Sequence, residues 1–134
     1  MREDTKACTF GTESPYVELA AEVFSLLADA TRVRIVLALR DAELPVNALA
    51  EVVGKSPTAV SQHLAKLRWG RIVRARQEGN RVFYSLIDEH ARTLVTQAVF
   101  QAQHAVDDHP QHHADGAHQA AEKPAAGSAD EAAR

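Results

Sequence analysis

The chain has 134 residues, of which 46% are hydrophobic and 25% charged, and its formal net charge is −3, values ordinary for one soluble globular domain with a modest core. A single cysteine, Cys8, excludes an intrachain disulfide, and no apolar run approaches the roughly 18 residues that a membrane span needs. The N-terminus lacks the apolar core of a signal peptide, so we expect a cytoplasmic protein with no membrane partner.

The composition divides the chain into three parts. Residues 1–14 are polar and should carry little order. Residues 15–106 hold the periodic apolar patterns of a folded domain. Residues 107–134 are a histidine-containing, alanine-rich tail that has little to bury and should be flexible.

Two helices are predicted first. The helix from Pro15 to Ala28 carries a wide apolar stripe, which either caps the core or pairs with another chain. The next helix is capped by Asp29 or Thr31, runs through Arg40, and is apolar around most of its circumference, so it should be central. Residues 41–45 read as an irregular connection. The stripe of the first helix consists of Tyr16, Leu19, Ala20, Val23, Phe24 and Leu27.

A helix-turn-helix pattern follows. A short helix from Val46 to Val53 ends at Gly54, a residue typical just beyond a helix C-terminus. Ser56 is a favourable N-cap and Pro57 suits the first position of a second helix, which should continue to Trp69. The two helices and their tight glycine turn match the DNA-binding motif. An ordinary amphipathic surface helix is the alternative for residues 57–69 taken alone.

The second helix has an apolar and a polar face. Val60, Leu64 and Leu67 form the apolar stripe, and the opposite face could read base edges in a major groove. From residue 55 to residue 81 there are seven basic residues against one acidic residue, so this segment carries +6 and the remainder −9. We therefore expect contacts with operator double-stranded DNA. The candidate DNA-binding residues here are Ser56, Thr58, Ser61, Gln62, His63, Lys66 and Arg68.

A β-hairpin should come next. Residues 72–77 and 81–86 are β-prone and flank the turn residues 78–80. A hairpin directly after a reading helix makes a winged helix-turn-helix, a mainly α fold with a small β-hairpin. Arg74, Arg76 and Arg81 make this wing a candidate for phosphate or minor-groove contact, with a merely solvated surface as the alternative. Asp88 then caps a final helix from about Glu89 to Ala105.

These elements and their residues together resemble the ArsR/SmtB family of metal-responsive repressors. The resemblance covers roughly residues 16–113 and is carried by residues 24–35, 49–54, 56–67 and 79–86, which include Ala-Asp-Ala-Thr-Arg and Ser-Gln-His-Leu-Ala-Lys-Leu. It implies a homodimer built on the first and last helices and a repressor that leaves its operator when an inducer binds. Asp88-Glu-His90, Ala98-Val-Phe100 and His112-His113 are most similar to the nickel/cobalt-sensing, KmtR-like branch.

The histidines suggest where an inducer would bind. His90 and His104 are 14 residues apart on one helix face, about 21 Å along the axis, too far for one ion. Two antiparallel copies of the helix could bring His90 of one chain to His104 of the other, making two symmetric sites. Gln101 stands where the wider family has a histidine ligand, and glutamine binds these metals poorly. The candidate ligands are His90, His104, His112 and His113, with Asp88 and His109 as additions.

Imidazole and carboxylate ligands suit Ni²⁺ or Co²⁺ if six donors gather, and Zn²⁺ if four close the site. Alternatively, the tail histidines are only a solvated tract, and the regulator responds to redox chemistry at Cys8 or to a protein partner. A hydrolytic enzyme is not expected, because the sequence shows no pairing of a nucleophile with a base.

Overall fold

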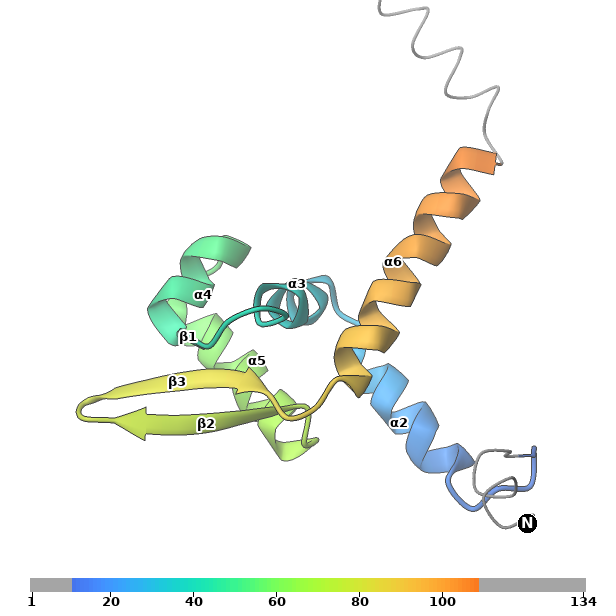
Figure 1. Ribbon diagram of the computed structural model, residues 1–134, viewed down its shortest axis with the longest axis horizontal. Helices are drawn as coiled ribbons and strands as arrows, with labels where there is room; N and C mark the ends of the chain where they lie inside the picture. The colour runs from blue at the N-terminus through green and yellow to red at the C-terminus, as the bar shows by residue number, and fades with distance from the viewer. Residues whose placement is uncertain (1–10, 109–134) are drawn as a thin grey trace, which may run out of the picture. The chain divides into compact units, whose positions relative to one another are not determined.

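The computed structural model describes residues 11–108. They belong to two units, of which the first ends at Val95 and the second begins at Thr96. The first unit is a winged helix-turn-helix, as the sequence predicts (Figure 1). No helix in the described range is long and apolar enough to cross a membrane. The elements are α2 Val17–Leu27, α3 Ala30–Ala38, β1 Leu44–Pro45, α4 Val46–Val53, α5 Pro57–Trp69, β2 Val73–Glu78, β3 Arg81–Leu86 and α6 His90–Asp108.

Side-chain caps start two of the helices where the sequence predicts them. At α3, the Asp29 carboxylate accepts a hydrogen bond from the Arg32 backbone N–H at 3.1 Å, so Asp29 rather than Thr31 is the cap. That bond is the main reason why the pKa of Asp29 is lowered. At α5, Ser56 Oγ accepts from the Ala59 N–H at 3.1 Å, and Pro57 occupies the first helical position.

The sheet has three antiparallel strands in the order β1-β3-β2. The predicted hairpin is confirmed: Glu78 pairs with Arg81 around a two-residue turn, where Gly79 has a φ of 65°. The irregular connection predicted at 41–45 is wrong at its end, because Leu44 and Pro45 pair with Tyr84 and Phe83. A two-residue edge strand that includes a proline has no sequence signature, and it exists only because β3 lies beside it.

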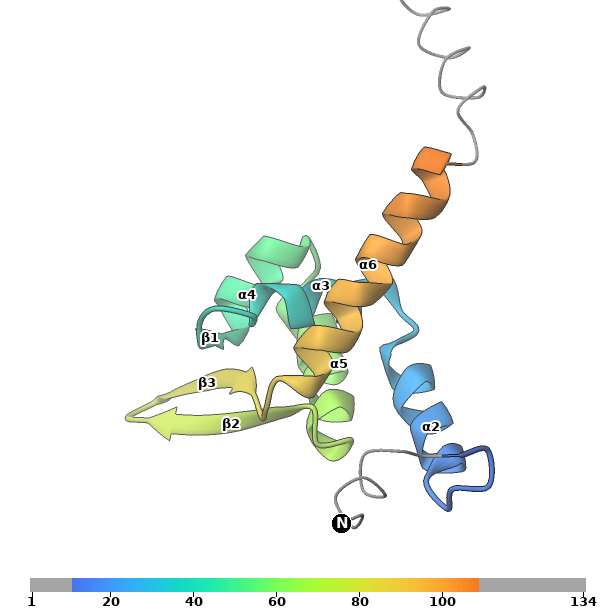
Figure 2. The same ribbon diagram turned by 45° about the vertical axis from the view of Figure 1, so that its right-hand side comes forward.

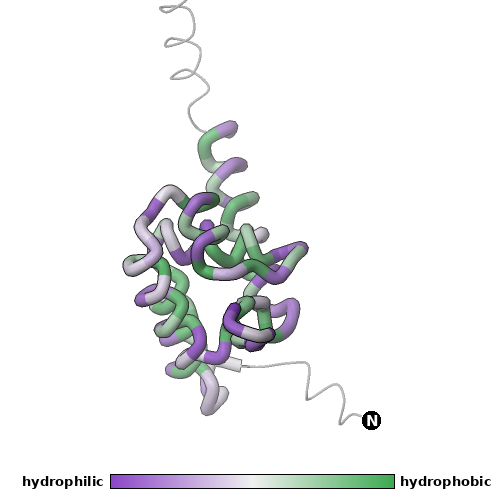
Figure 3. Tube along the Cα trace, turned by 90° about the vertical axis from the view of Figure 1, so that its left-hand side faces the viewer, coloured by the Kyte–Doolittle hydropathy of each residue, from purple (hydrophilic) through white to green (hydrophobic). Residues whose placement is uncertain are grey.

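The core of the first unit lies between α3, α4 and α5, with β2 and the start of α6 against it (Figure 2). Along the chain trace, hydrophobic and hydrophilic residues alternate at short intervals (Figure 3), the pattern expected of helices with one buried side. The prediction that α3 is central is confirmed by its buried Ile35 and Val36. The fully buried side chains are Ile35, Leu49, Leu64, Leu67, Val36, Val60 and Val73.

The apolar stripe of α2 contributes little to this core. Leu27 is buried, and Val23 and Leu26 pack against the core. Phe24 and Leu19, by contrast, are 59% and 53% exposed. The sequence left two explanations for this stripe, capping the core or pairing with another chain. Capping the core accounts for only the C-terminal end of the stripe.

The end of α5 combines a C-cap glycine with a left-handed arginine. Gly70 keeps an ordinary negative φ of −83°, and Arg71 adopts the left-handed conformation with a φ of 63°. A Cβ atom at Gly70 would come too close to Leu26 Cδ2 of α2, so any larger residue there would force the Leu26 side chain to shift. The chain therefore places an arginine in a backbone conformation that favours glycine.

Replacing this arginine by glycine should stabilise the fold. We expect Arg71→Gly to raise the free energy of unfolding by about 1 kcal/mol, because glycine has no Cβ penalty at positive φ. Urea unfolding would show a higher midpoint with an unchanged slope. The matched control is Arg68→Gly inside α5, which should lower stability by up to about 1 kcal/mol. Two variants that change stability in the same direction would contradict this account.

Candidate nucleic-acid interface

The polar face of α5 is open to solvent. Val60, Leu64 and Leu67 are completely buried, so the helix cannot rotate without exposing them. Polar side chains on the opposite side then point outward, at positions 58, 61, 62 and 66. Positions 61 and 62 follow position 58 by three and four residues, and position 66 follows position 62 by four, so these side chains share one helix face. The predicted DNA-binding residues of this region that the structure exposes are Ser56, Thr58, Ser61, Gln62, Lys66 and Arg68.

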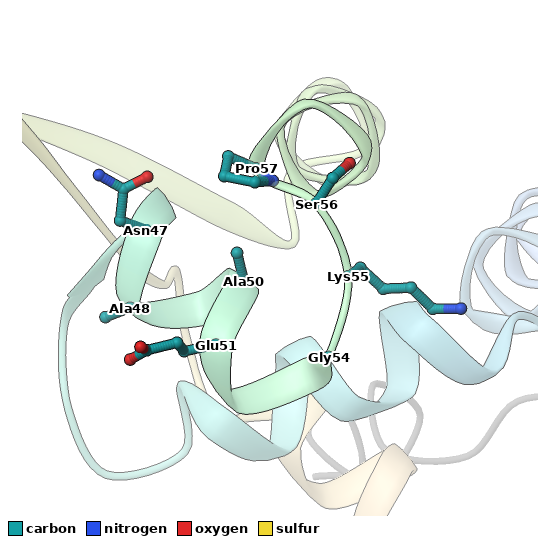
Figure 4. A pocket seen from close by; sticks show the side chains of 8 residues that line it. All are labelled: Asn47, Ala48, Ala50, Glu51, Gly54, Lys55, Ser56 and Pro57. Atoms are coloured by element: carbon teal, nitrogen blue, oxygen red, sulfur yellow. The ribbon is translucent and has the colours of Figure 1, made fainter.

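The start of α5 is also uncovered. Gly54, with a φ of 70°, ends α4, and residues 54–56 turn the chain directly into α5. A shallow hollow of about 590 Å³ lies beside this turn, between Asn47 and Glu51 of α4 and Pro57 of α5 (Figure 4). An exposed helix N-terminus carries free backbone N–H groups and a partial positive charge, which favour a phosphate.

His63 differs from the other predicted reading residues. Its side chain is half-buried, and its Nδ1 accepts a hydrogen bond from Arg32 Nε at 3.0 Å. Arg32 also donates from Nη1 to the Leu26 carbonyl at 2.9 Å. Sequence reasoning missed Arg32, because nothing local signals a contact between residues 31 positions apart.

The wing arginines have partners within the chain. Arg76 forms ion pairs with Glu43 at 2.7 Å and Glu78 at 2.9 Å, and its guanidinium lies over the Phe83 ring. The hydrogen bond from Arg76 lowers the pKa of Glu43, and the two carboxylates raise the pKa of Arg76. The predicted phosphate contact of Arg76 must therefore compete with two carboxylates.

The other two wing arginines are less constrained. Arg74 donates to the Ile87 carbonyl at 2.9 Å and forms no ion pair within residues 11–108, although its charge helps to lower the pKa of Glu43. The Arg81 guanidinium also lies over the Phe83 ring, at 5.2 Å from its centroid, and forms no ion pair within residues 11–108. Both side chains are exposed on the hairpin, so both remain available to DNA.

Of the predicted metal ligands, the structure of residues 11–108 shows Asp88 and His90 together. Asp88 and His90 lie together at the start of α6, where an Asp88 carboxylate oxygen accepts from the His90 backbone N–H at 2.9 Å. His104 lies on the part of α6 in the second unit, and His109, His112 and His113 fall outside the described residues. Within residues 11–108, no three histidine, cysteine, aspartate or glutamate side chains gather. The donor chemistry of Asp88 and His90 suits a metal, but two groups need others from the tail or from a second chain.

Known bacterial regulators are similar to this chain in sequence. Residues 29–75 match the model of a family described as bacterial regulatory protein, arsR family. The HTH-type transcriptional regulator KmtR of Mycobacterium tuberculosis (strain ATCC 25618 / H37Rv) is 56% identical over 95 residues, which are 71% of this chain and 73% of KmtR. The segment matched by the family model, residues 29–75, includes the turn between α4 and α5 and the whole of α5.

Two solved structures have the same fold. The homodimeric winged helix-turn-helix DNA-binding domain of a Mycobacterium bovis regulator aligns with a TM-score of 0.62 at 28% identity, covering 75% of this chain and 97% of that domain. The AntR antimony-specific transcriptional repressor aligns with a TM-score of 0.64 at 30% identity, covering 77% of this chain and 95% of AntR.

Removing the carboxylate of Glu43 should release Arg76 toward DNA. We expect Glu43→Gln to bind a generic duplex more tightly, and the plot of log affinity against log salt to steepen by about one unit if Arg76 gains one phosphate contact. Fluorescence anisotropy over a salt series would measure both. Glu13→Gln removes an exposed carboxylate outside the hairpin and should leave the slope unchanged. An unchanged slope for Glu43→Gln would show that removing this carboxylate adds no phosphate contact, contrary to the release expected here.

Proposed function

The chain belongs to the ArsR family of bacterial regulatory proteins, which bind DNA and are not enzymes, and from that membership we propose that it is a metal-responsive transcriptional repressor. It binds operator DNA as a homodimer and is released when Ni²⁺ or Co²⁺ binds, with Zn²⁺ as the alternative inducer. The observation that carries the DNA-binding half is the uncovered polar face of α5, which the buried stripe Val60–Leu64–Leu67 turns outward.

The exposed residues of α5 make two kinds of contact with DNA, to base edges and to phosphates. Thr58, Ser61 and Gln62 carry hydroxyl and amide groups that hydrogen-bond to base edges, with His63 beside them. Lys66 and Arg68 follow in the last turns of the helix, where cations contact phosphates. Arg74 and Arg81 extend these contacts to the wing, and Arg76 joins them if it exchanges carboxylates for phosphate. In a homodimer, two such helices lie about one turn of DNA apart, near 34–36 Å, and match an inverted repeat.

Exposed apolar side chains support dimerisation through α2 and α6. On α2, Tyr16, Leu19 and Phe24 are more than half exposed. On α6, Phe100 and Val106 are also exposed, at 47% and 63%. Burying these apolar groups against another surface lowers the free energy of the protein. A second copy of the chain carries the same exposed groups and can therefore bury them in a symmetric interface. Residues 15–106 would then form the DNA-binding and dimerisation domain.

The proposed inducer site uses residues of both chains. His90 and Asp88 would bind the ion with His104 of the other chain, and His112, His113 and His109 would complete the set. The bound ion would supply coordination bonds that join the two α6 helices. The chain's own contribution is to hold His90 at a helix start, where Asp88 accepts the His90 backbone N–H. Because coupling between two ligands is reciprocal, operator DNA must weaken metal binding as much as metal weakens operator binding.

Support for the metal comes from the resemblance to the nickel/cobalt-sensing branch and from the likeness to an antimony-specific repressor. The competing proposal is a winged-helix regulator with a non-metal input, such as redox chemistry at Cys8 or a protein partner. As a DNA-binding regulator, the protein would act in the cytoplasm.

A titration would test the inducer. We expect Ni²⁺, Co²⁺ or Zn²⁺ to weaken operator binding measured by anisotropy, and His90→Ala to abolish this response while metal-free binding stays intact. Arg92→Gln, an exposed position on another face of the same helix, should respond to metal as the wild type does. If none of the three ions changes operator affinity, the non-metal proposal replaces this one. If His90→Ala also loses metal-free binding, its role is structural.

Two substitutions on α5 would separate base reading from phosphate binding. Gln62→Ala should cost about 1–3 kcal/mol on the operator and little on an unrelated duplex, because an amide reads a base edge. Lys66→Ala should weaken both duplexes alike and reduce the salt slope by about one unit. Equal losses on both duplexes for Gln62→Ala would contradict a reading role.

A further inference from the structure

Arg32 connects three helices of the first unit through one side chain. The half-buried guanidinium belongs to α3 and donates from Nη1 to the Leu26 carbonyl at 2.9 Å. That carbonyl lies in the last turn of α2, where carbonyl groups have no partner within the helix. From Nε, Arg32 donates to His63 Nδ1 of α5 at 3.0 Å. The end of α2, the start of α3 and the reading helix are thus tied to one residue.

The chemistry of the second bond determines where His63 carries its hydrogen. A guanidinium has five N–H donors and no acceptor, so His63 Nδ1 must be the unprotonated acceptor. A neutral imidazole with a bare Nδ1 has its hydrogen on Nε2. Among residues 11–108, no group accepts a hydrogen bond from that Nε2. His63 therefore has one N–H donor still to satisfy.

We propose that Arg32 is a positioning residue of the DNA-reading helix, which holds His63 in the Nε2–H form so that it offers a single hydrogen-bond donor to DNA. This inference rests on the proposed operator binding by α5. A donor matches acceptor atoms of DNA, which are guanine O6 and N7, adenine N7, thymine O4 and the phosphate oxygens. It does not match the amino group of cytosine, so the tautomer restricts what His63 can contact.

The helix that carries Arg32 also provides a matched control. Arg34 is an exposed arginine two residues further along α3 and makes no side-chain hydrogen bond or ion pair within the described residues. Arg34→Met makes the same chemical change as Arg32→Met: each removes one positive charge and replaces an arginine side chain by a methionine side chain. Differences between the two variants therefore report the contacts of Arg32 and not the lost charge.

The tautomer can be measured without DNA. Long-range ¹H–¹⁵N correlation spectra of the full chain should show His63 with its hydrogen on Nε2 in the wild type and in Arg34→Met. In Arg32→Met the ring should exchange between both tautomers, since its Nδ1 loses the donor. A wild-type His63 with its hydrogen on Nδ1, or already exchanging, would overturn the proposal even if Arg32→Met fails to fold.

Operator binding tests whether Arg32 acts through His63. We expect Arg32→Met and His63→Ala each to weaken operator binding roughly tenfold, the loss typical of one hydrogen bond. The double variant should bind no worse than His63→Ala alone, because both remove the same contact. If Arg32→Met weakens binding as much in the His63→Ala background as in the wild type, Arg32 acts by another route and the proposal is wrong.

A comparison of two duplexes identifies the acceptor. A loss for His63→Ala that is confined to the operator identifies a base edge, and an equal loss on an unrelated duplex identifies a phosphate. If the wild type binds no operator at all, the proposed function fails, while the tautomer measurement still decides whether Arg32 controls His63.

Discussion

Three completely buried side chains, Val60, Leu64 and Leu67, hold α5 on the core, and the presentation of the rest of that helix depends on them. Burying an aliphatic side chain of this size stabilises the folded state by about 1.5–3 kcal/mol. Rotating the helix to another face would expose all three and bury lysine, arginine or glutamine in their place. The polar face therefore points outward because of what the opposite face buries, and a DNA-reading surface needs no separate device to keep it exposed.

The charges around this helix matter through their positions more than through their sum. The chain is net negative, yet residues 55–81 carry a local excess of positive charge. Within the wing that excess is only partly available, because Arg76 is paired with Glu43 and Glu78 in the free protein. Exposed ion pairs of this kind contribute little stability, so exchanging carboxylate for phosphate would cost little. The wing can thus remain compact without DNA and still keep a cationic surface.

The polar contacts of α5 also connect reading to the remainder of the fold. Arg32 joins the end of α2 to His63. A movement of α2 relative to α3 would therefore displace the Arg32 side chain and, through its two hydrogen bonds, change the position of the His63 ring on α5. Dimerisation and DNA binding are proposed for different surfaces, and this side chain provides a physical link between them. Helix packing alone would leave the orientation of the His63 ring undetermined.

The sequence by itself determined the elements whose signals are local. The cap at Ser56, the left-handed Gly54 and the stripe of α5 act over three to seven residues, and the helices α4 and α5 have the predicted bounds. Only the tertiary structure decided β1, the Arg76–Glu43 pair and the Arg32–His63 bond. The paired strand residues are 38 and 40 positions apart in the sequence, and the two polar pairs are 33 and 31 apart, so no periodicity or cap can signal them. Only the tertiary structure shows what limits position 70, because a Cβ atom there would force the Leu26 side chain of α2 to shift.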